Sequence, residues 1–562
     1  MEKTPTNKKE HRNFIENIIA ADLDSGKNGG KVITRFPPEP NGYLHIGHAK
    51  AICLNHGLAW NNEPNSKFHL RFDDTNPEKE ETEYVDAIKE DVAWLGADWK
   101  DNLFFSSDYF DKLYDFALEL INKGLAFVDD QTPDEIHANR GSFEKPGTNS
   151  PYRERSIEEN LKLFQEMKDG KYQDGEKVLR AKIDMGSSFM CMRDPIIYRI
   201  RHVKHHRTGN KWCIYPMYDY THGLSDAIEG ITHSLCTLEF QDNRRVYDWF
   251  VENVSAPSRP YQYESARLNL DYTMMSKRKL LQLVQDKHVE GWDDPRMPTI
   301  SGVRRRGYPA AGIRNFMEQI GVGKENNIIE LSILEANVRD QLNKTTKRCL
   351  GVLDPIKVTI TNWDDGEQEI DAPFHPKDES YGRRKINFGP ELYIDASDFM
   401  EEPPSPKKWY RLGPDRSVRL RYGYVITCDE FVKEGDKVVE LKCRYHKDSF
   451  AGVQPAALVK KVKGIIHWVN ANDAKDVEVR LYDRLFKHED PASLEDFTSE
   501  LNPESLSIIQ AKVEPYLSQA KAGEQFQFER MGYFTADSKY SKDGAPVFNR
   551  TVGLRDSWGK SK

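Results

Sequence analysis

The sequence predicts a multidomain α/β fold whose C-terminal half consists of antiparallel β-barrels, and three observations lead to this. At 562 residues the chain is too long for a single core, so about three to five domains are expected. Residues 31–55 have the pattern of a strand, a rigid loop and a helix, which is typical of an α/β sheet. Past Gly351, short β-rich runs separated by proline and glycine fill about 200 residues, enough for two barrels.

The loop at 35–47 joins the first predicted strand to the first long helix. Lys31–Thr34 predicts the strand, and helical spacing resumes at His48–Asn55. Between them, three prolines and Asn41-Gly42 force a turn that no regular element can continue through. A helix that starts directly after a strand points its backbone N–H groups at a crevice where phosphate can sit.

Three side-chain positions at this helix start suit a nucleotide. Gly47 has no Cβ, so a flat base can lie against its backbone. His45 and His48 lie three residues apart and can reach the same phosphate, each as a hydrogen-bond donor. Four residues alone can also be an accident of a helix start, and it is the flanking sequence that favours the nucleotide site.

Composition excludes several classes of protein. No apolar run approaches the roughly 18 residues of a membrane span, and residues 1–11 lack the apolar core of a secretory signal, so a cytoplasmic protein with no membrane partner is expected. Seven scattered cysteines contain no C-x-x-C pair, which argues against a disulfide framework and a zinc ribbon. The histidines between 202 and 233 do not have metal-ligand spacing either.

Basic clusters suggest an extended polyanionic partner in spite of a net charge of −9. They lie at 199–207, 304–306, 383–385 and 460–463. Any one of them can be an ordinary solvated face. Four along one chain fit a phosphate-binding track better.

The N-terminal half contains a second candidate ligand site. A buried strand is predicted at 67–72, and Asp73 and Asp74 follow it at the edge of the sheet that faces the crevice. Asp73 can there hold an ammonium group, or the two aspartates can merely cap the next helix. Segments 211–222 and 231–243 mix aromatic, hydroxyl and small residues as binding pockets do, although an ordinary core can look the same.

Helices are predicted at 12–24, from Ser107 to Gly124 with Ser107 as cap, and from a capping box at Ser156 to Gly170. Residues from about 109 to 217 therefore form an insertion between the halves of the sheet. Further on, the polar loop 271–280 opens a helix with Ser276 as cap, and Lys277 beside a helix N-terminus suits a triphosphate. Two more helices follow.

The string from Pro37 to His48 resembles the first signature of class I aminoacyl-tRNA synthetases, in its glutaminyl and glutamyl branch. With Met275-Ser276-Lys277 and the β-rich C-terminal half, the whole chain is similar to the bacterial-type glutaminyl-tRNA synthetases, from about Phe14 to Trp558. Long strings carry the likeness, among them 70–77, 210–219, 229–245, 291–299 and 548–556.

The resemblance implies a Rossmann-like nucleotide-binding catalytic domain with an inserted acceptor-stem domain, a helical subdomain and two C-terminal barrels. The expected boundaries are an N-terminal helix at 1–25, the first catalytic half at 26–108, the acceptor-stem insertion at 109–217, the second catalytic half at 218–270, the MSK loop and helical connecting subdomain at 271–347, and two anticodon-binding β-barrels at 348–562.

It also implies three sets of site residues. ATP would bind Glu39, Pro40, Asn41, His45, Ile46, Gly47, His48, Ala49, Lys50, Ala51, Thr237, Arg267, Leu268, Met275, Ser276 and Lys277, with His45, His48 and Lys277 as the catalytic donors. Glutamine would bind Arg35, Asp73, Tyr218, Cys236, Phe240 and Gln262, with an internal network occupying Arg35. The tRNA would contact Phe143, Asp242, Arg348, Arg411, Gln527 and Arg530.

The implied activity is the ATP-dependent ligation of L-glutamine to tRNA(Gln), by a monomer that uses Mg²⁺ with its ATP and has no structural zinc. Two positions differ from common members. Phe143 replaces an aliphatic residue in the loop expected to open the first base pair, and 274–278 departs from the general Lys-Met-Ser-Lys-Ser.

Three alternatives stay open. A glutamyl-tRNA synthetase has the same architecture, and a non-catalytic tRNA-binding paralogue can keep the same shell. A small nucleotidyltransferase shares the His-x-Gly-His chemistry, but has no use for the long β-rich half.

Overall fold

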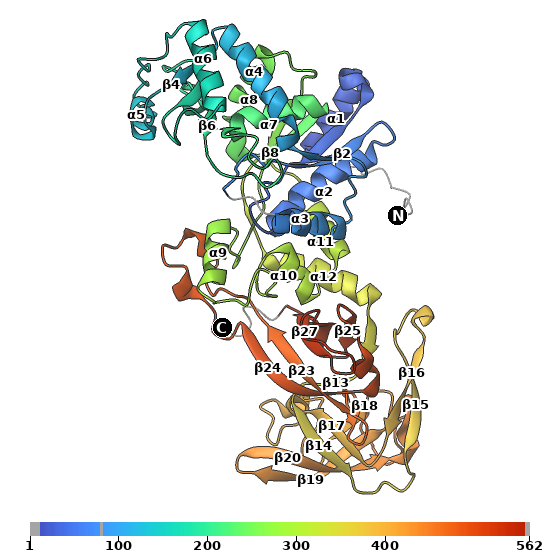
Figure 1. Ribbon diagram of the computed structural model, residues 1–562. Coiled ribbons are helices and arrows are strands. Elements are labelled where there is room, and N and C mark those ends of the chain that lie inside the picture. The colour runs from blue at the N-terminus through green and yellow to red at the C-terminus, as the bar shows by residue number, and fades with distance from the viewer. Residues whose placement is uncertain (1–11, 79–81, 557–562) are drawn as a thin grey trace. The chain divides into compact units, whose positions relative to one another are not determined.

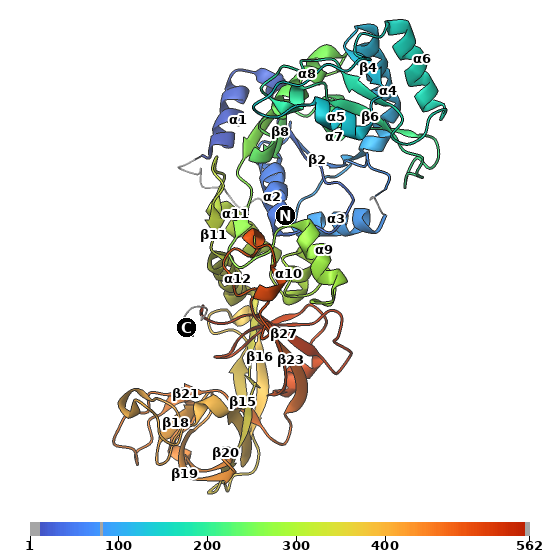
Figure 2. The ribbon, with the colours of Figure 1, turned by 90° about the vertical axis from the view of Figure 1, so that its left-hand side faces the viewer.

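The computed structural model describes residues 12–78 and 82–556 (Figures 1 and 2). Trp558, to which the family likeness extends, and residues 1–11 of the expected N-terminal segment lie outside this range. The chain divides into two compact units, one of residues 1–269 with 317–328, and one of residues 270–316 with 329–562.

A parallel sheet organises the first unit. Strands β1 (Ile33–Phe36), β2 (Lys67–Phe72) and β3 (Leu103–Phe105) pair in that order, all parallel. Strands β8 (His233–Thr237) and β9 (Tyr261–Ser265) form a second parallel pair. Thr232 N donates to Ile33 O at 3.0 Å, so β8 begins beside β1. The carboxyl ends of β1, β2 and β8 therefore open onto one crevice, which confirms the Rossmann-like expectation.

Helices precede the first strand of this unit and connect the strands that follow (Figure 1). They are α1 (Phe14–Asp24), α2 (Ile46–Asn61), α3 (Thr82–Trp94), α7 (Tyr218–Glu229) and α8 (Arg244–Asn253). Helix α2 starts at the end of the proline-rich loop and runs along β1 and β2, and α7 packs on α8. The helix start at His45 is thus fixed by the sheet beneath it.

Between β3 and α7 the chain forms a separate antiparallel sheet with its own core. The elements are α4 (Phe110–Asn122), β4 (Ala126–Asp129), α5 (Pro133–Asn139), α6 (Ile157–Lys168), β5 (Val178–Ala181), β6 (Ile196–Ile200) and β7 (Ile214–Pro216). Ser156 caps α6, because its side chain accepts from Glu159 N at 3.2 Å, but the reciprocal bond of the predicted capping box is absent among the described residues, and Glu159 Oε1 lies 3.3 Å from Arg155 Nε instead. Ser107 does not cap α4; its hydroxyl donates to Asp74, and α4 begins after a 3₁₀ turn at Ser106–Tyr109.

The second unit begins with helices, the first of which packs on a small apolar cluster. They are α9 (Lys277–Gln285), α10 (Ile300–Arg306) and α12 (Leu331–Thr345), while β10 (Asn269–Leu270), α11 (Ala310–Ile320) and β11 (Ile328–Ile329) span the limits of the units. Met274, Leu280 and Leu283 pack against Phe486 and Phe497. Ser276 stands at the N-cap of α9, but its side chain makes no capping bond within the described residues, so the predicted cap is wrong in its chemistry.

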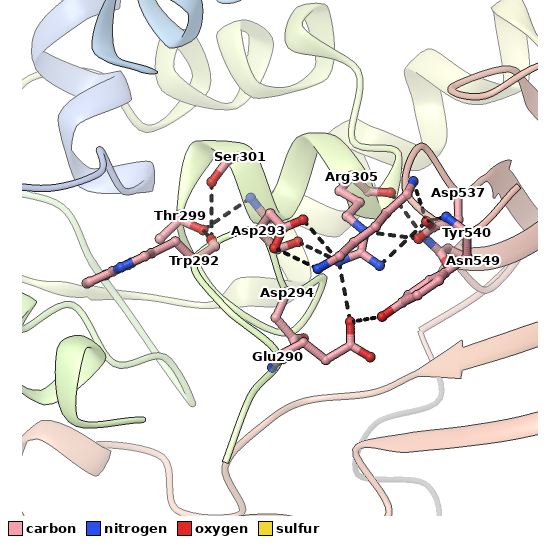
Figure 3. A network of polar contacts seen from close by, with 12 residues as sticks. Glu290, Trp292, Asp293, Asp294, Thr299, Ser301, Arg305, Asp537, Tyr540 and Asn549 are labelled. Carbon is pink, nitrogen blue, oxygen red and sulfur yellow. Dashed lines mark hydrogen bonds and ion pairs between the residues drawn. The ribbon is translucent and has the colours of Figure 1, made fainter. Parts of the chain in front are cut away.

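A buried ion network ties these helices to the last strands (Figure 3). Arg305 of α10 contacts Asp537 Oδ2 with its Nε at 3.0 Å and Asp293 Oδ2 with its Nη1 at 3.2 Å. Tyr540 donates to Glu290 Oε2 at 2.8 Å, and Asn549 donates to Asp537 Oδ2 at 2.5 Å. The buried charge of Arg305 is therefore shared among the carboxylates of Asp537, Asp293 and Glu290.

Two curled seven-stranded sheets complete the second unit, as the barrel prediction expects (Figures 1 and 2). One has the order β21-β18-β19-β20-β14-β17-β22, with β14 (Pro355–Ile360), β17 (Glu391–Asp395), β18 (Ser417–Leu420), β19 (Val425–Glu434), β20 (Lys437–His446), β21 (Ile465–Ile466) and β22 (Val469–Asn470). The other has the order β12-β25-β26-β27-β23-β24-β13, with β12 (Lys347–Cys349), β13 (Gly351–Val352), β23 (Lys475–Tyr482), β24 (Leu506–Val513), β25 (Gln525–Phe528), β26 (Gly532–Ala536) and β27 (Val547–Val552).

The two sheets are nested in sequence rather than consecutive. β12 and β13 precede the first sheet, whereas β23–β27 follow it, and together they form the second sheet. Most pairs are antiparallel, but β12–β25, β23–β27, β14–β20 and β18–β21 are parallel. A separate ribbon, β15 (Gln368–Pro373) with β16 (Arg383–Phe388), contributes Arg384 to a buried pair with Glu514.

Candidate functional site

The two histidines at the start of α2 are locked by the backbone. His45 Nδ1 accepts from Gly47 N at 3.1 Å, and His48 Nδ1 accepts from His45 N at 3.0 Å. Their ring centroids are 4.0 Å apart. Because each Nδ1 is an acceptor, each neutral ring carries its proton on Nε2. The pair therefore offers two oriented N–H donors beside the helix N-terminus, where anions are stabilised.

The other expected ATP residues of the first unit gather near this helix start. Lys50 Nζ donates to Ala266 O at 2.8 Å, which brings α2 next to the segment of Arg267 and Leu268. Arg267 is paired with Glu239, which also accepts from Thr237 Oγ1 at 3.5 Å. In the loop before α2, Asn41 Nδ2 donates to Glu39 Oε2 at 2.5 Å. Of the remaining expected residues, Pro40, Ile46, Ala49 and Leu268 are buried, and Gly47 and Ala51 are half-buried. Burial limits the first four to a shaping role.

Asp73 lies at the carboxyl end of β2, and only one of its carboxylate oxygens accepts hydrogen bonds. Its Oδ1 accepts from Arg71 Nε at 2.7 Å and from Ser106 Oγ at 3.1 Å. Its Oδ2 has no hydrogen-bond partner within the described part of the chain. Burial opposes ionisation of Asp73, but the neighbouring Arg71 outweighs it and lowers the pKa of this carboxyl. A buried anionic oxygen without a donor is a binding position for an ammonium group.

Arg35, which is fully buried, has all three guanidinium nitrogens engaged. Nε donates to Asp226 Oδ1 at 3.0 Å, Nη1 donates to Leu235 O at 2.8 Å, and Nη2 contacts His222 and Ser234 Oγ, both at 2.8 Å. Arg71 Nη1 shares the same Asp226 oxygen at 2.7 Å. The charge of Arg35 is therefore neutralised inside the protein.

His222 connects this network to Asp73. Arg35 can only donate, so His222 Nε2 must be the acceptor and its proton stands on Nδ1. That Nδ1 lies 3.6 Å from Asp73 Oδ2 and has no hydrogen-bond partner among the described residues. The ring is thus held with its remaining donor directed at the open carboxylate oxygen.

The other expected glutamine-binding residues lie close to His222. The ring of Tyr218 is 5.0 Å from that of His222 and 5.8 Å from that of Phe240. Gln262 donates to Phe240 O at 3.0 Å. Cys236 Sγ lies 3.7 Å from both Arg35 Nη2 and His222 Nε2. Burial raises the pKa of Tyr218 far above its usual value, so its hydroxyl is neutral. These residues therefore lie around the network in which Arg35 is paired with Asp226.

The expected tRNA residues of the first unit lie on exposed segments. Phe143, at the tip of the loop 140–147, is 86% exposed. Asp242 is exposed just before α8, and its carbonyl accepts from Cys191 Sγ at 3.4 Å.

In the second unit, the expected anticodon residues form two pairs. Arg348 of β12 and Gln527 of β25 are register partners. Arg530 makes two contacts with buried Asp398, at 2.6 and 2.7 Å, and Arg411 Nε lies 3.3 Å from Asp398 Oδ1. Met275 and Ser276 precede Lys277 at the start of α9.

Comparison with known families gives three matches in chain order. A family model described as tRNA synthetases class I (E and Q), catalytic domain, matches residues 31–344. Two further models, both described as anticodon-binding domains of these synthetases, match residues 346–446 and 465–537. The chain belongs to the class I tRNA synthetases of the E and Q type. It is therefore an enzyme of ligase type, which agrees with the resemblance read from the sequence.

Curated relatives of this synthetase match over almost its whole length. A glutamine–tRNA ligase of Pseudomonas putida is 56% identical over 553 residues, which cover 97% of this chain and 96% of the relative. Glutamine–tRNA ligases of Shigella dysenteriae and Escherichia coli O157:H7 are each 56% identical over 549 residues, with 98% of both chains covered.

Sequence analysis of this synthetase missed the residues that support the pocket. Arg71, His222, Asp226 and Ser234 do not appear among the predicted site residues, yet they fix Arg35 and Asp73. A signal was available for one of them. Arg71 is a charged residue within the buried part of β2, and such a charge needs a partner.

One group of ligand-type side chains comes together in the described part of the synthetase, namely Asp74, His205 and His206. Asp74 accepts from Ser107 N at 2.8 Å, from Ser107 Oγ at 2.7 Å and from His206 Nε2 at 3.1 Å. His205 Nε2 donates to the Asp74 carbonyl at 2.8 Å. Since these atoms are engaged with one another, the cluster holds the inserted domain to the end of β2.

Proposed function

We propose that this synthetase ligates L-glutamine to the terminal ribose of tRNA(Gln) through a glutaminyl-adenylate, for protein synthesis. The relatives that match nearly the full chain at 56% identity all bear the name glutamine–tRNA ligase. The catalytic and anticodon-binding family matches together account for most of the chain.

The observation that carries the proposal is the geometry around Asp73. Its Oδ2 is buried and makes no hydrogen bond within residues 12–78 and 82–556, since His222 Nδ1, which is directed at it, stays 3.6 Å away. Tyr218, Phe240 and Gln262 lie beside the same network. The α-ammonium of glutamine would bind Oδ2, and its side-chain amide would lie near the hydroxyl of Tyr218. An ammonium that pairs with a buried carboxylate gains a charge-assisted hydrogen bond.

ATP would bind along the start of α2. The Nε2 donors of His45 and His48 and the backbone N–H groups of the helix N-terminus suit its phosphates. Lys277 would add a cation to the triphosphate, with Met275 and Ser276 completing the site. Mg²⁺, held by the phosphate oxygens of bound ATP, would neutralise part of their charge.

Two displacement steps follow from these positions. The glutamine carboxylate attacks the α-phosphorus and pyrophosphate leaves; the ribose 2′-hydroxyl then attacks the adenylate carbonyl and AMP leaves. His45, His48 and Lys277 stabilise the oxygen charge that develops in the first step. No protein nucleophile takes part, so the protein contributes positioning and electrostatic stabilisation.

Selection of glutamine over glutamate follows from the engaged state of Arg35. A glutamate side chain in this pocket would be a buried carboxylate whose nearest guanidinium already pairs with Asp226. Burial of such an unpaired charge costs several kcal/mol or more. The glutamyl alternative is therefore less supported than the glutaminyl one.

The tRNA would contact both units. We assign residues 26–108 and 218–270 to the catalytic domain, 109–217 to the acceptor stem, 271–347 to the connecting subdomain and 348–562 to the anticodon. Asp242 would contact the minor groove of the acceptor stem, and Phe143 would separate its first base pair, since an aromatic ring can stack on a freed base. Arg348, Arg411, Gln527 and Arg530 would contact anticodon bases.

Location and assembly belong to the same proposal. No helix in the described part of the chain has the length and hydropathy of a membrane span. Charging tRNA for translation requires access to ribosomes, so we place the enzyme in the cytoplasm, acting as a monomer.

The deciding experiment is ATP–pyrophosphate exchange with tRNA(Gln) present, run in parallel on glutamine and on glutamate. We expect exchange with glutamine and a preference of at least about 1,000-fold in kcat/KM over glutamate, because several kcal/mol separate the two buried side chains. Preference for glutamate would establish the glutamyl alternative. No exchange with either amino acid, together with tight tRNA binding, would establish a non-catalytic tRNA-binding protein.

A further inference from the structure

The loop that carries Phe143 has a tight and unusual backbone. Ser142 N donates to Lys145 O at 3.0 Å, and Lys145 N donates back to Ser142 O at 3.3 Å. Gly141 has a φ of +76°, and a Cβ there would lie 2.6 Å from Lys145 O. Phe143 is therefore at the corner of a closed turn, with its ring in solvent.

One buried side chain fills the base of this turn. Arg193 Nη1 lies 2.8 Å from Arg140 O, 2.9 Å from Ser142 O and 2.9 Å from Lys145 O. Its Nε donates to Ser187 O at 2.7 Å. Arg193 is 3% exposed and lies between the 3₁₀ turn at Met190–Met192 and β6, so its side chain reaches the loop from the interior of the inserted domain.

Three carbonyl oxygens that converge on one point repel one another unless a donor lies between them. The guanidinium nitrogen supplies that donor and a positive charge, and charge-assisted hydrogen bonds are about twice as strong as neutral ones. Without this donor, the repulsion among the three carbonyl oxygens would no longer be offset, and the loop backbone would change its conformation. An exposed aromatic ring on a loosened loop would then move away from the position that the turn defines.

We propose that Arg193 is the positioning residue that shapes the 140–147 loop so that Phe143 meets the first base pair of the acceptor stem. This rests on the proposed function, in which Phe143 separates that pair. Arg193 itself does not touch the RNA; it acts through the backbone of the loop.

The test compares two tRNA(Gln) transcripts, one with a paired and one with a mismatched first base pair. A mismatch opens the pair without help from the loop. Charging rates are measured for Arg193→Met, which removes all donors and keeps an unbranched apolar side chain, and for Arg193→Lys, which keeps the charge on one ammonium group in place of the guanidinium. Lys145→Met is the matched control, because it removes a loop cation and keeps the carbonyl that Arg193 contacts.

We expect Arg193→Met to lose about tenfold or more in kcat/KM on the paired transcript, since the loop would lose the charged donor on which three of its carbonyls converge, and to regain most of it on the mismatched one. Arg193→Lys should fall between Arg193→Met and wild type. Lys145→Met should change both transcripts equally. An equal loss on both transcripts for the Arg193 variants, or no loss, would overturn the inference.

The variant Phe143→Ala tests separately whether Phe143 opens the first base pair, on which the role of Arg193 depends. If Phe143→Ala also prefers the mismatched transcript, the wedge is established and the result for Arg193 decides the present proposal alone. If Phe143→Ala has no such preference, the wedge itself is wrong and the inference falls with it. If Arg193→Met does not fold, the comparison of paired and mismatched transcripts with Arg193→Lys decides the proposal.

Discussion

Nδ1 of His222 faces Oδ2 of Asp73 across 3.6 Å, and neither atom has a hydrogen-bond partner within the described residues. The gap is too long for a good hydrogen bond. Arg35 holds one side of this pair and Arg71 holds the other, so neither side chain can collapse onto its neighbour. The Asp73 carboxylate is therefore held in place without a hydrogen bond to His222, and its Oδ2 can accept one from a ligand.

Asp73→Asn should raise the KM for glutamine by roughly 10- to 100-fold, because it replaces the anionic acceptor of the ammonium group by a neutral one. Charging kinetics with saturating ATP and tRNA measure this. Asp74→Asn is the matched control. Its carboxylate already accepts from Ser107 and His206, so this change should lower the melting temperature instead. If the two variants have the same glutamine KM, Asp73 does not bind the ammonium.

Lys277→Ala should reduce tRNA-dependent pyrophosphate exchange by about 100- to 1,000-fold, since one cation would be lost from the transition state. The affinity for tRNA should stay the same. Arg278→Ala removes the next cation of α9, which is exposed, and should have little effect on exchange. Equal rates for the two variants would rule out the triphosphate role of Lys277.

Asp398→Asn should weaken tRNA binding and destabilise the second unit by about 3 kcal/mol, because two arginines would lose a buried partner. Binding should be measured with tRNA(Gln) and with a transcript of altered anticodon. If Arg411 and Arg530 contact the anticodon, the difference in affinity between the transcripts should shrink. The control is Asp371→Asn, whose pair with Arg383 is exposed and contributes little. An unchanged difference in affinity would place the arginines elsewhere.

The protein should lose free energy of unfolding in acid because of His467. Burial and the neighbouring Arg530 lower the pKa of His467 to about 4, from an ordinary value of 6.5. Its Nδ1 accepts from Arg530 Nη1 at 2.9 Å, which requires the neutral ring. The unfolded chain therefore binds this proton first, so stability is complete above pH 6.5 and falls as the pH approaches 4.

The size of this effect is about 3 kcal/mol at most, from the difference in pKa. Urea unfolding of wild type and His467→Gln between pH 7 and pH 4 measures it. The glutamine amide keeps an acceptor for Arg530 and does not titrate, so the variant should lose less stability in acid. Parallel curves for both proteins would show that His467 does not contribute.

The sequence is informative where chemistry and local structure coincide. Prolines and Asn41-Gly42 in front of His45 dictate a helix start, and the structure has α2 begin at Ile46. The β-rich C-terminal half is equally visible, because short runs with turn residues can form little else. The family matches agree with this order of domains, with a catalytic domain at 31–344 and two anticodon-binding domains at 346–446 and 465–537.

Long-range pairing is what the sequence does not disclose. Ser107 and Ser276 are of a residue type, and at positions, that favour helix caps. The hydroxyl of Ser107 instead donates to Asp74, thirty-three residues away in sequence. Arg71 and Asp226 are 155 residues apart and meet only because β2 and α7 lie against each other. Local propensity has no access to such partners, and so the support around Arg35 and Asp73 was missed.

The nesting of the curled sheets has a consequence for synthesis on the ribosome. Strand β12 ends at Cys349, but its partner β25 starts only at Gln525. At about 5 to 20 residues per second, roughly 10 to 35 s pass before that partner is made. The intervening sheet can fold in this time. Until β25 is made, the backbone N–H and C=O groups of β12 on that side stay unpaired, and a chaperone that binds nascent chains is suited to shield them.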